Sequence, residues 1–159
     1  MIKNPREIVS QWILTIENQD QIQQNGIDLT LWEISIIRPW ENILTKNERK
    51  HTERVPVEFD DEWGVILWKG EYDILFAEKI NLPNWICSYV VQRSTLNRGW
   101  NFTTSGWYDA GFSGPMGWVL HITQGSLKIQ KWVRIAQMVF LSAEQWDLYE
   151  WVYNWARTV

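Results

Sequence analysis

Short apolar runs recur along most of this chain, and their length and spacing limit the folds that it can adopt. The runs lie at residues 65–68, 72–76, 86–91, 107–108, 118–122, 127–129 and 135–141. Residues typical of turns separate them: Gly70, Pro83-Asn84, Gly99, the segment from Gly111 to Gly117, and Gly125. Many short strands with a turn roughly every 8–12 residues are typical of an all-β barrel or jelly roll and not of an α/β sheet. We therefore predict a mainly β fold of that kind.

The first part of the chain carries a different pattern, which predicts a helix from about residue 5 to residue 18. Asn4 is a suitable N-cap, and Pro5 suits the first helical position. The apolar residues that follow repeat at helical spacing: Ile8, Val9, Trp12, Ile13 and Ile16. Residues 27–36 then alternate as a strand does, and the charged segment 41–62 is predicted to be an exposed loop.

Length and charge exclude several classes of protein. The 159 residues correspond to one domain, 1–159, and the formal net charge of −4 argues against a non-specific binder of nucleic acid or of membrane surfaces. One cysteine, Cys87, and two histidines are too few for a structural zinc site or a zinc deaminase. No signal-like segment or apolar run of ~20 residues occurs, so we expect a cytoplasmic protein whose partners are small molecules or proteins.

Four clusters combine the residue types that a phosphate-handling site requires. They are Asn25-Gly26-Ile27-Asp28-Leu29, Gln92-Arg93-Ser94-Thr95, the segment 105–114 around Asp109, and Arg134-Ile135-Ala136-Gln137. Taken singly, each has an ordinary explanation: a strand-edge acid at Asp28, surface charges at Arg93 and Arg134, or a plain turn at Asp109. Their order and mutual spacing favour a functional role.

In this order the clusters resemble the trimeric dUTPase and dCTP deaminase superfamily, particularly its archaeal and archaeal-virus members. The specific motifs are Gly106-Trp107-Tyr108-Asp109-Ala110-Gly111-Phe112 and, further on, Arg134-Ile135-Ala136-Gln137. The resemblance implies a distorted jelly-roll barrel with an N-terminal helix, assembled as a homotrimer with active sites between subunits. It also implies hydrolysis of dUTP to dUMP and pyrophosphate, with Mg²⁺ as the cofactor.

The same resemblance implies roles for individual residues. Asp109 would orient and activate the attacking water, and Asp28 would act on the phosphate-bound Mg²⁺ through water. The residues expected to contact the triphosphate are Arg93, Ser94, Arg134 and Gln137. Those expected to hold the base and the deoxyribose are Thr103, Thr104, Gly106, Tyr108 and Phe112, with Phe112 stacked where a ribose 2′-hydroxyl would clash.

The superfamily contains two chemistries, and one position helps to separate them. Its deaminases need a glutamate on the strand after the motif that contains Asp109, and Val119 stands at that position here. No Asp or Glu occurs between Asp109 and Glu144, which disfavours dCTP deamination. His121 on the same strand is interpreted as a packed or surface residue. A carbohydrate or single-strand nucleic-acid binder, suggested by the aromatic residues alone, ranks below these alternatives.

Tryptophan is the unusual component of this sequence. The chain has 13 tryptophans, more than its five tyrosines and five phenylalanines together. Compared with the family pattern, Trp32, Trp132, Trp151 and Trp155 stand where glycines are expected, the last two in the C-terminal arm at about 145–159. Glycine-to-tryptophan replacement at turn and motif positions therefore explains part of the excess. Because the arm loses its glycines, a catalytically weak nucleotide-binding or regulatory protein remains an alternative.

Overall fold

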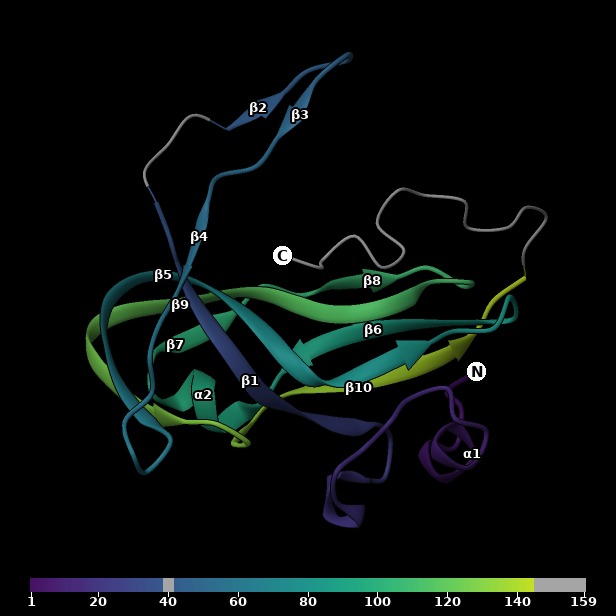
Figure 1. Cartoon of the computed structure of the whole chain (residues 1–159). Coiled ribbons are helices and arrows are strands. Elements are labelled where there is room, and N and C mark those ends of the chain that lie inside the picture. The colour runs from purple at the N-terminus through teal and green to yellow at the C-terminus, as the bar shows by residue number, and fades with distance from the viewer. Residues whose placement is uncertain (39–41, 145–159) are drawn as a thin grey trace.

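The computed structural model describes residues 1–38 and 42–144. Its main feature is an eight-stranded sheet that curls around an apolar core, with strand order β7-β9-β5-β1-β10-β6-β8 and with β4 pairing β1 (Figure 1). The strands of this sheet are β1 Ile27–Ile37, β4 Arg54–Pro56, β5 Gly64–Asn81, β6 Ile86–Gln92, β7 Asn101–Thr103, β8 Gly106–Tyr108, β9 Ser113–Gln130 and β10 Arg134–Ser142. The predicted mainly β, barrel-like fold is confirmed.

The charged segment after β1 forms a projection from this sheet. Strands β2 (Ile43–Leu44) and β3 (Arg49–Lys50) pair in a small hairpin that stands away from the barrel in Figure 1. Strand β4 returns the chain to the barrel by pairing with the end of β1, with Ser35 opposite Pro56. The described residues of this segment are mostly exposed, as predicted.

The predicted strand breaks at Gly70 and Gly125 are wrong, because both glycines lie within long strands, and the predicted break at 111–117 is wrong from Ser113 on, where β9 begins. Strand β5 pairs with β9 on both sides of these glycines, but the register shifts between Trp68 and Gly70. The extra residues of β9 at this shift include Gly125, whose φ of +59° suits glycine. The two glycines therefore bend a continuous pair of strands and help the sheet to curl.

The predicted N-terminal helix is present, but it is shorter than expected. Helix α1 spans Pro5–Ser10, and the side chain of Asn4 accepts a hydrogen bond from the backbone N–H of Arg6 at 3.0 Å. The helix does not reach residue 18, because Trp12 adopts a φ of +58° and turns the chain. Leu14 then pairs with Ile80 at the end of β5 and is buried in the core. Apolar spacing alone could not separate this extended segment from more helix.

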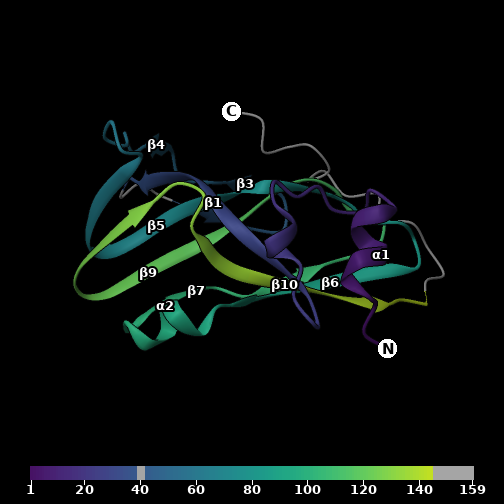
Figure 2. The same cartoon turned by 90° about the horizontal axis from the view of Figure 1, so that it is seen from below.

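Two further short helices complete the described structure. They are the 3₁₀ turn η1 at Gln19–Gln21 and α2 at Ser94–Arg98. Helices α1 and α2 lie at opposite ends of the barrel (Figure 2). In residues 1–38 and 42–144, no helix is long and apolar enough to cross a membrane.

Candidate active site

Three of the four sequence clusters meet around one buried carboxylate, Asp28 in strand β1. Its Oδ2 atom lies 3.4 Å from Nε of Arg93 and 3.6 Å from Nη1 of Arg134. Its Oδ1 atom accepts a hydrogen bond from Nε2 of Gln137 at 3.3 Å. Arg93 also donates from Nη1 to the backbone carbonyl of Arg134 at 3.3 Å. We call these four residues the Asp28 cluster.

Strand register explains why residues so far apart in sequence meet here. Strand β10 lies between β1 and β6, so that Asp28 is opposite Gln137 and Gln137 is opposite Val91. Directly opposed residues point to the same face of a sheet, which places the side chains of Asp28 and Gln137 together. Arg93 follows the end of β6, and Arg134 opens β10 opposite Thr30.

The electrostatics of the Asp28 cluster are those of a charge held away from water. Asp28 is 1% exposed, and its burial raises the pKa of its carboxyl even though Arg93, Gln137 and Arg134 act to lower it. The Oδ2 atom has two guanidinium groups at ion-pair distance but no hydrogen-bond partner. This oxygen therefore keeps the capacity to accept a hydrogen bond from a bound water.

Ser94, the other predicted phosphate ligand, is the first residue of α2 and is exposed. It follows Arg93 directly, so the guanidinium-bearing residue and the hydroxyl-bearing residue are adjacent at the end of β6, as the cluster predicted. Among the described residues, no group of three or more His, Cys, Asp or Glu side chains could hold a metal ion. A lone carboxylate fits a cation that keeps most of its waters and takes its other ligands from substrate phosphates, as Mg²⁺ does.

The predicted catalytic residue, Asp109, lies apart from the Asp28 cluster within this chain. It is exposed in the turn after β8, where its carbonyl accepts a hydrogen bond from the N–H of Phe112 at 3.0 Å. Its neighbour Tyr108 pairs with Ser88 on β6, three strands from Asp28 and three residues along from Val91. Three strand spacings and three residues along a strand place Tyr108 roughly 17 Å from Asp28 across the sheet.

A second observation places Asp109 at the far end of β6 from Arg93. Burial raises the pKa of the Cys87 thiol, and the nearby charge of Asp109 raises it further. Cys87 stands near the start of β6, whereas Arg93 follows its last residue. Within one chain, Asp109 and Arg93 therefore lie near opposite ends of β6.

The predicted base and sugar residues lie in the β7–β9 hairpin, which consists of β7, the antiparallel strand β9 and the connection between them. This connection contains β8, which pairs with β6. Thr104 and Val119 are joined by two hydrogen bonds: Thr104 N–H to the Val119 carbonyl at 2.9 Å, and Val119 N–H to Oγ1 of Thr104 at 3.1 Å. Gly106 lies against the ring of Trp118, and a Cβ on Gly106 would come within 2.3 Å of that ring. This close approach requires a glycine at position 106.

The aromatic members of this hairpin are packed inward. Tyr108 and Phe112 are 8% and 7% exposed, and their ring centroids are 5.1 Å apart. The Oγ1 atom of Thr103 is buried without a hydrogen-bond partner. Thr103 therefore offers an unused polar atom beside the hairpin, whereas most of the Phe112 ring is covered by its own chain.

Two polar residues support this region: Gln92, which belongs to a predicted cluster but had no predicted role, and Glu78, which the sequence did not point to. Gln92 accepts a hydrogen bond from the N–H of Thr103 at 3.2 Å, and so connects the end of β6 to the hairpin. Glu78 is 2% exposed and hydrogen-bonds Gln21 and Thr30, which flank Asp28 in the structure. No local signal separates Glu78 from the other charged residues of β5, which are Lys69, Glu71, Asp73 and Lys79.

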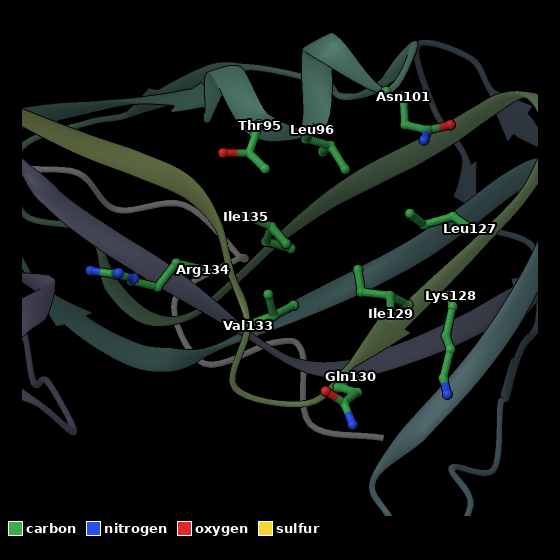
Figure 3. Close-up of a pocket in the computed structure, with 11 residues that line it drawn as sticks. Thr95, Leu96, Asn101, Leu127, Lys128, Ile129, Gln130, Val133, Arg134 and Ile135 are labelled. Atoms are coloured by element: carbon green, nitrogen blue, oxygen red, sulfur yellow. The ribbon is translucent and has the colours of Figure 1, made fainter.

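A cavity of about 430 Å³ lies beside the Asp28 cluster, between α2 and the turn that joins β9 to β10. Figure 3 shows its mainly apolar lining, which includes Leu96, Ile129 and Ile135, with the guanidinium of Arg134 directed away from them. The Oδ1 atom of Asn101, another lining residue, is buried without a hydrogen-bond partner. The sequence did not predict this cavity.

The remaining residues that the sequence singled out have ordinary surroundings or lie outside the described part. Nδ1 of His121 lies 3.3 Å from Oε1 of Glu71, and the His121 ring stacks on Phe102 with centroids 4.5 Å apart, as expected for a packed residue. The predicted C-terminal arm at 145–159, with Trp151 and Trp155, lies outside the described residues.

The chain is similar to known proteins over most of its length. A family model described as dCTP deaminase-like matches residues 5–143. The chain is 34% identical over 144 residues to a Methanosarcina acetivorans protein named "Probable deoxyuridine 5'-triphosphate nucleotidohydrolase", covering 87% of this chain and 84% of that protein. It is 33% identical over 146 residues to "dCTP deaminase, dUMP-forming" of Persephonella marina, covering 88% of this chain and 81% of that protein.

A solved structure shows the same fold. The 2'-deoxycytidine 5'-triphosphate deaminase from Agrobacterium tumefaciens superposes with a TM-score of 0.67 at 19% identity, over 85% of this chain. The present chain spans 45% of the length of that protein chain.

Proposed function

Because the chain belongs to the dCTP deaminase-like family, we propose that it is an enzyme that hydrolyses dUTP to dUMP and pyrophosphate. The observation that carries the proposal is the Asp28 cluster, in which Arg93, Arg134 and Gln137 converge on one buried acid from separate parts of the chain. Two guanidinium groups and an amide suit the binding of a polyphosphate. The dUTP-specific name of the Methanosarcina acetivorans relative supports the choice of substrate.

The active site in this proposal is completed by a second copy of the chain in a homotrimer. One chain holds Asp109 roughly 17 Å across the sheet from the Asp28 cluster, too far for both to contact the same phosphate. The face of β6 and β10 between these half-sites carries the half-buried side chains of Tyr89, Val91 and Val139. A neighbouring copy docked on this face would bring its own Asp109 to the Asp28 cluster.

Hydrolysis then proceeds by in-line attack of water on the α-phosphorus. The Asp109 carboxylate orients this water and takes its proton, so that the new bond forms between the water oxygen and phosphorus. The bond from the α-phosphorus to the bridging oxygen breaks, and pyrophosphate leaves with the electron pair. Arg93 and Arg134 bind the oxygens on which negative charge accumulates, with Ser94 and Gln137 as hydrogen-bonding partners.

Mg²⁺ fits this site as a companion of the triphosphate: it would neutralise phosphate charge, and Asp28 would hold it through bound water. The free acceptor capacity of the Asp28 Oδ2 atom supports this assignment. The positive charges of Arg93 and Arg134 oppose the direct approach of an unliganded cation, because both lie within 3.6 Å of that oxygen.

The β7–β9 hairpin is the proposed site of base and sugar selection. The backbone around Thr104 and Gly106 would read the polar edge of uracil, and the buried Oγ1 of Thr103 supplies a further acceptor or donor. Phe112 and Tyr108 form the floor beneath this hairpin. A pocket that pairs each polar group of one base rejects other bases, because a mismatch leaves buried groups unpaired.

The second candidate function is formation of dUMP from dCTP, the activity named for the Persephonella marina relative. It needs an acid beside the base, and Val119 supplies none. Asp73 lies opposite Val119 on strand β5, but its carboxylate is ion-paired with Nε of Arg54 at 2.9 Å. An acid committed to that ion pair is poorly suited to carry protons, which favours dUTP as the substrate.

Incubation with dUTP, dCTP, UTP and dTTP, with and without Mg²⁺, tests the proposal. We expect Mg²⁺-dependent release of dUMP and pyrophosphate from dUTP alone. Formation of dUMP from dCTP would support the second candidate. Tight binding of dUTP without turnover would instead indicate a regulatory nucleotide-binding protein.

A further inference from the structure

Glu78 is a buried carboxylate that the proposed reaction does not use. It is 2% exposed in strand β5, and burial raises the pKa of its carboxyl despite hydrogen bonds that act to lower it. Oε1 accepts hydrogen bonds from Nε2 of Gln21 at 2.6 Å and from Oγ1 of Thr30 at 2.7 Å, and Oε2 accepts from the N–H of Thr30 at 3.0 Å. Burying a carboxylate is costly even when hydrogen bonds offset part of the cost, so the presence of an acid at this position calls for an explanation.

Both hydrogen-bond partners of Glu78, Thr30 and Gln21, are connected to residues of the Asp28 cluster. Thr30 is opposite Arg134 in the β1–β10 pairing, and this pairing is shifted by a bulge between Leu29 and Thr30. Gln21 donates a second hydrogen bond from Nε2 to the carbonyl of Asp28 at 2.9 Å. Glu78 therefore holds β1 on both sides of Leu29, directly at Thr30 and through Gln21 at the backbone of Asp28, beside the irregular pairing with β10.

The η1 turn also connects Glu78 to Arg134 through hydrogen bonds. Oε1 of Gln21 accepts hydrogen bonds from the N–H groups of Glu17 and Asn18, both at 2.9 Å, which closes this segment around the Gln21 side chain. The carbonyl of Asp20 then accepts a hydrogen bond from Nη1 of Arg134 at 2.9 Å. The position of the Arg134 guanidinium thus depends on the η1 turn, which Glu78 holds through its hydrogen bond with Gln21.

We propose that Glu78 is a positioning residue that holds Thr30, opposite the β10 bulge, and the η1 turn so that Asp28 and Arg134 form a phosphate-binding site. A neutral glutamine cannot replace it, because its amide offers one acceptor oxygen and turns an NH₂ group toward a hydrogen-bond donor. This inference rests on the proposed function for its ligand class, a polyphosphate.

Pyrophosphate binding measured by calorimetry tests the proposal, because it reports on the phosphate site whichever nucleotide the chain hydrolyses. We expect Glu78→Gln to weaken binding about tenfold, a typical coupling within one hydrogen-bond network. The matched control is Asp73→Asn, which alters another buried acid of the same strand, ion-paired with Arg54 outside the site. Asp73→Asn should leave the affinity for pyrophosphate unchanged. Equal affinities for wild type and Glu78→Gln would overturn the positioning role.

A second variant pair covers the case in which Glu78→Gln does not fold. Thr30→Val removes the hydroxyl that donates to Glu78, whereas Thr30→Ser keeps it, so only the valine variant should weaken pyrophosphate binding. In an Arg134→Ala background, Thr30→Val should cause a smaller loss, because the part of its effect that acts through Arg134 is already absent. An undiminished loss there would mean that Thr30 does not act through Arg134. Assays of wild type with dUTP test the proposed function separately.

An independent observation concerns the tryptophans. In residues 1–38 and 42–144, every non-glycine residue with a positive φ is a tryptophan: Trp12, Trp63, Trp100 and Trp132, with φ values from 57° to 66°. This left-handed conformation favours glycine and is strained for a bulky side chain. Trp132 is also a position where the resemblance to the family implies glycine.

The side chains of most described tryptophans are exposed, although Trp32 and Trp132 contact each other with ring centroids 5.0 Å apart. Eight tryptophans are exposed, in a residue type that is normally well buried: Trp12, Trp32, Trp63, Trp68, Trp85, Trp100, Trp107 and Trp132. Trp118 is half-buried, but its indole N–H is buried without a partner and its ring presses on Gly106. The four tryptophans with a positive φ thus combine a backbone that suits glycine with an exposed side chain.

We infer that the protein made in its own cell carries glycine at the four positive-φ positions, Trp12, Trp63, Trp100 and Trp132. A codon that one translation system decodes as tryptophan and another as glycine would place tryptophan at all of them together. Independent mutations would not confine the positive-φ positions to one residue type. Peptide mass spectrometry of the protein from its native cell tests this inference. Glycine in the peptides that cover Trp63 and Trp100 would support it, and tryptophan would overturn it.

Discussion

Replacing Trp12 and Trp100 together by glycine should stabilise the protein. Both have left-handed backbone conformations, with φ values of 58° and 57°, and their side chains are 78% and 74% exposed. Releasing a non-glycine residue from this conformation gains about 1–2 kcal/mol. Glycine in the unfolded chain costs about 0.4–1 kcal/mol in entropy. Little packing is lost, so each substitution should add about 0.5–1 kcal/mol.

The two gains should be additive, because Trp12 follows α1 and Trp100 follows α2 at opposite ends of the barrel (Figure 2). The double variant should therefore unfold with about 1–2 kcal/mol more free energy than wild type, measured by urea denaturation with an unchanged m-value. Trp68→Gly is the matched control, since Trp68 is 68% exposed inside strand β5 and has no positive φ. Glycine within a strand should cost about 0.5–1 kcal/mol. If the double variant loses stability as the control does, the strain argument is refuted.

Four further outcomes follow from the site and the core. Asp109→Asn should lower turnover of dUTP by about 10²–10⁴-fold in a steady-state assay while leaving dUTP binding measurable by calorimetry. Chelating Mg²⁺ with EDTA should remove the same activity, and added Mg²⁺ should restore it. Leu14→Ala should cost about 2–5 kcal/mol in urea denaturation, because Leu14 is 1% exposed after the early end of α1. Burial raises the pKa of Asp28, so its contribution to stability is fully present below the unfolded value of about 3.9 and is lost as pH rises through the folded pKa. The free energy of unfolding of wild type relative to Asp28→Asn should therefore fall from pH 4 toward pH 7, and a rise would contradict that sign.

Periodicity in the sequence was sufficient for the fold class but not for the ends of its elements. The apolar runs 86–91 and 135–141 match β6 and β10 closely, because hydrophobic alternation acts locally. Helix α1 stops early for a non-local reason: Leu14 pairs with Ile80, far along the chain. Gly70 and Gly125 resemble turn signals, but the pairing of β5 with β9 continues past both.

The candidate site was predictable where a motif names its residues and not where support comes from distant strands. Asp28, Arg93 and Gln137 were selected from their motifs, and the structure brings them together. Glu78 escaped notice because its partner Thr30 lies 48 residues away in sequence. No local pattern records such a contact, since it depends on which strands become neighbours.

The distance between Asp109 and the Asp28 cluster affects how activity depends on protein concentration and on the mixing of variants. If each reaction centre draws on two copies of the chain, specific activity falls on dilution below the assembly concentration, although every chain stays folded. Asp109→Asn and Arg93→Ala would each be inactive alone, yet mixing them would create centres in which both half-sites are intact. Two defective alleles of this gene would then complement each other within one cell.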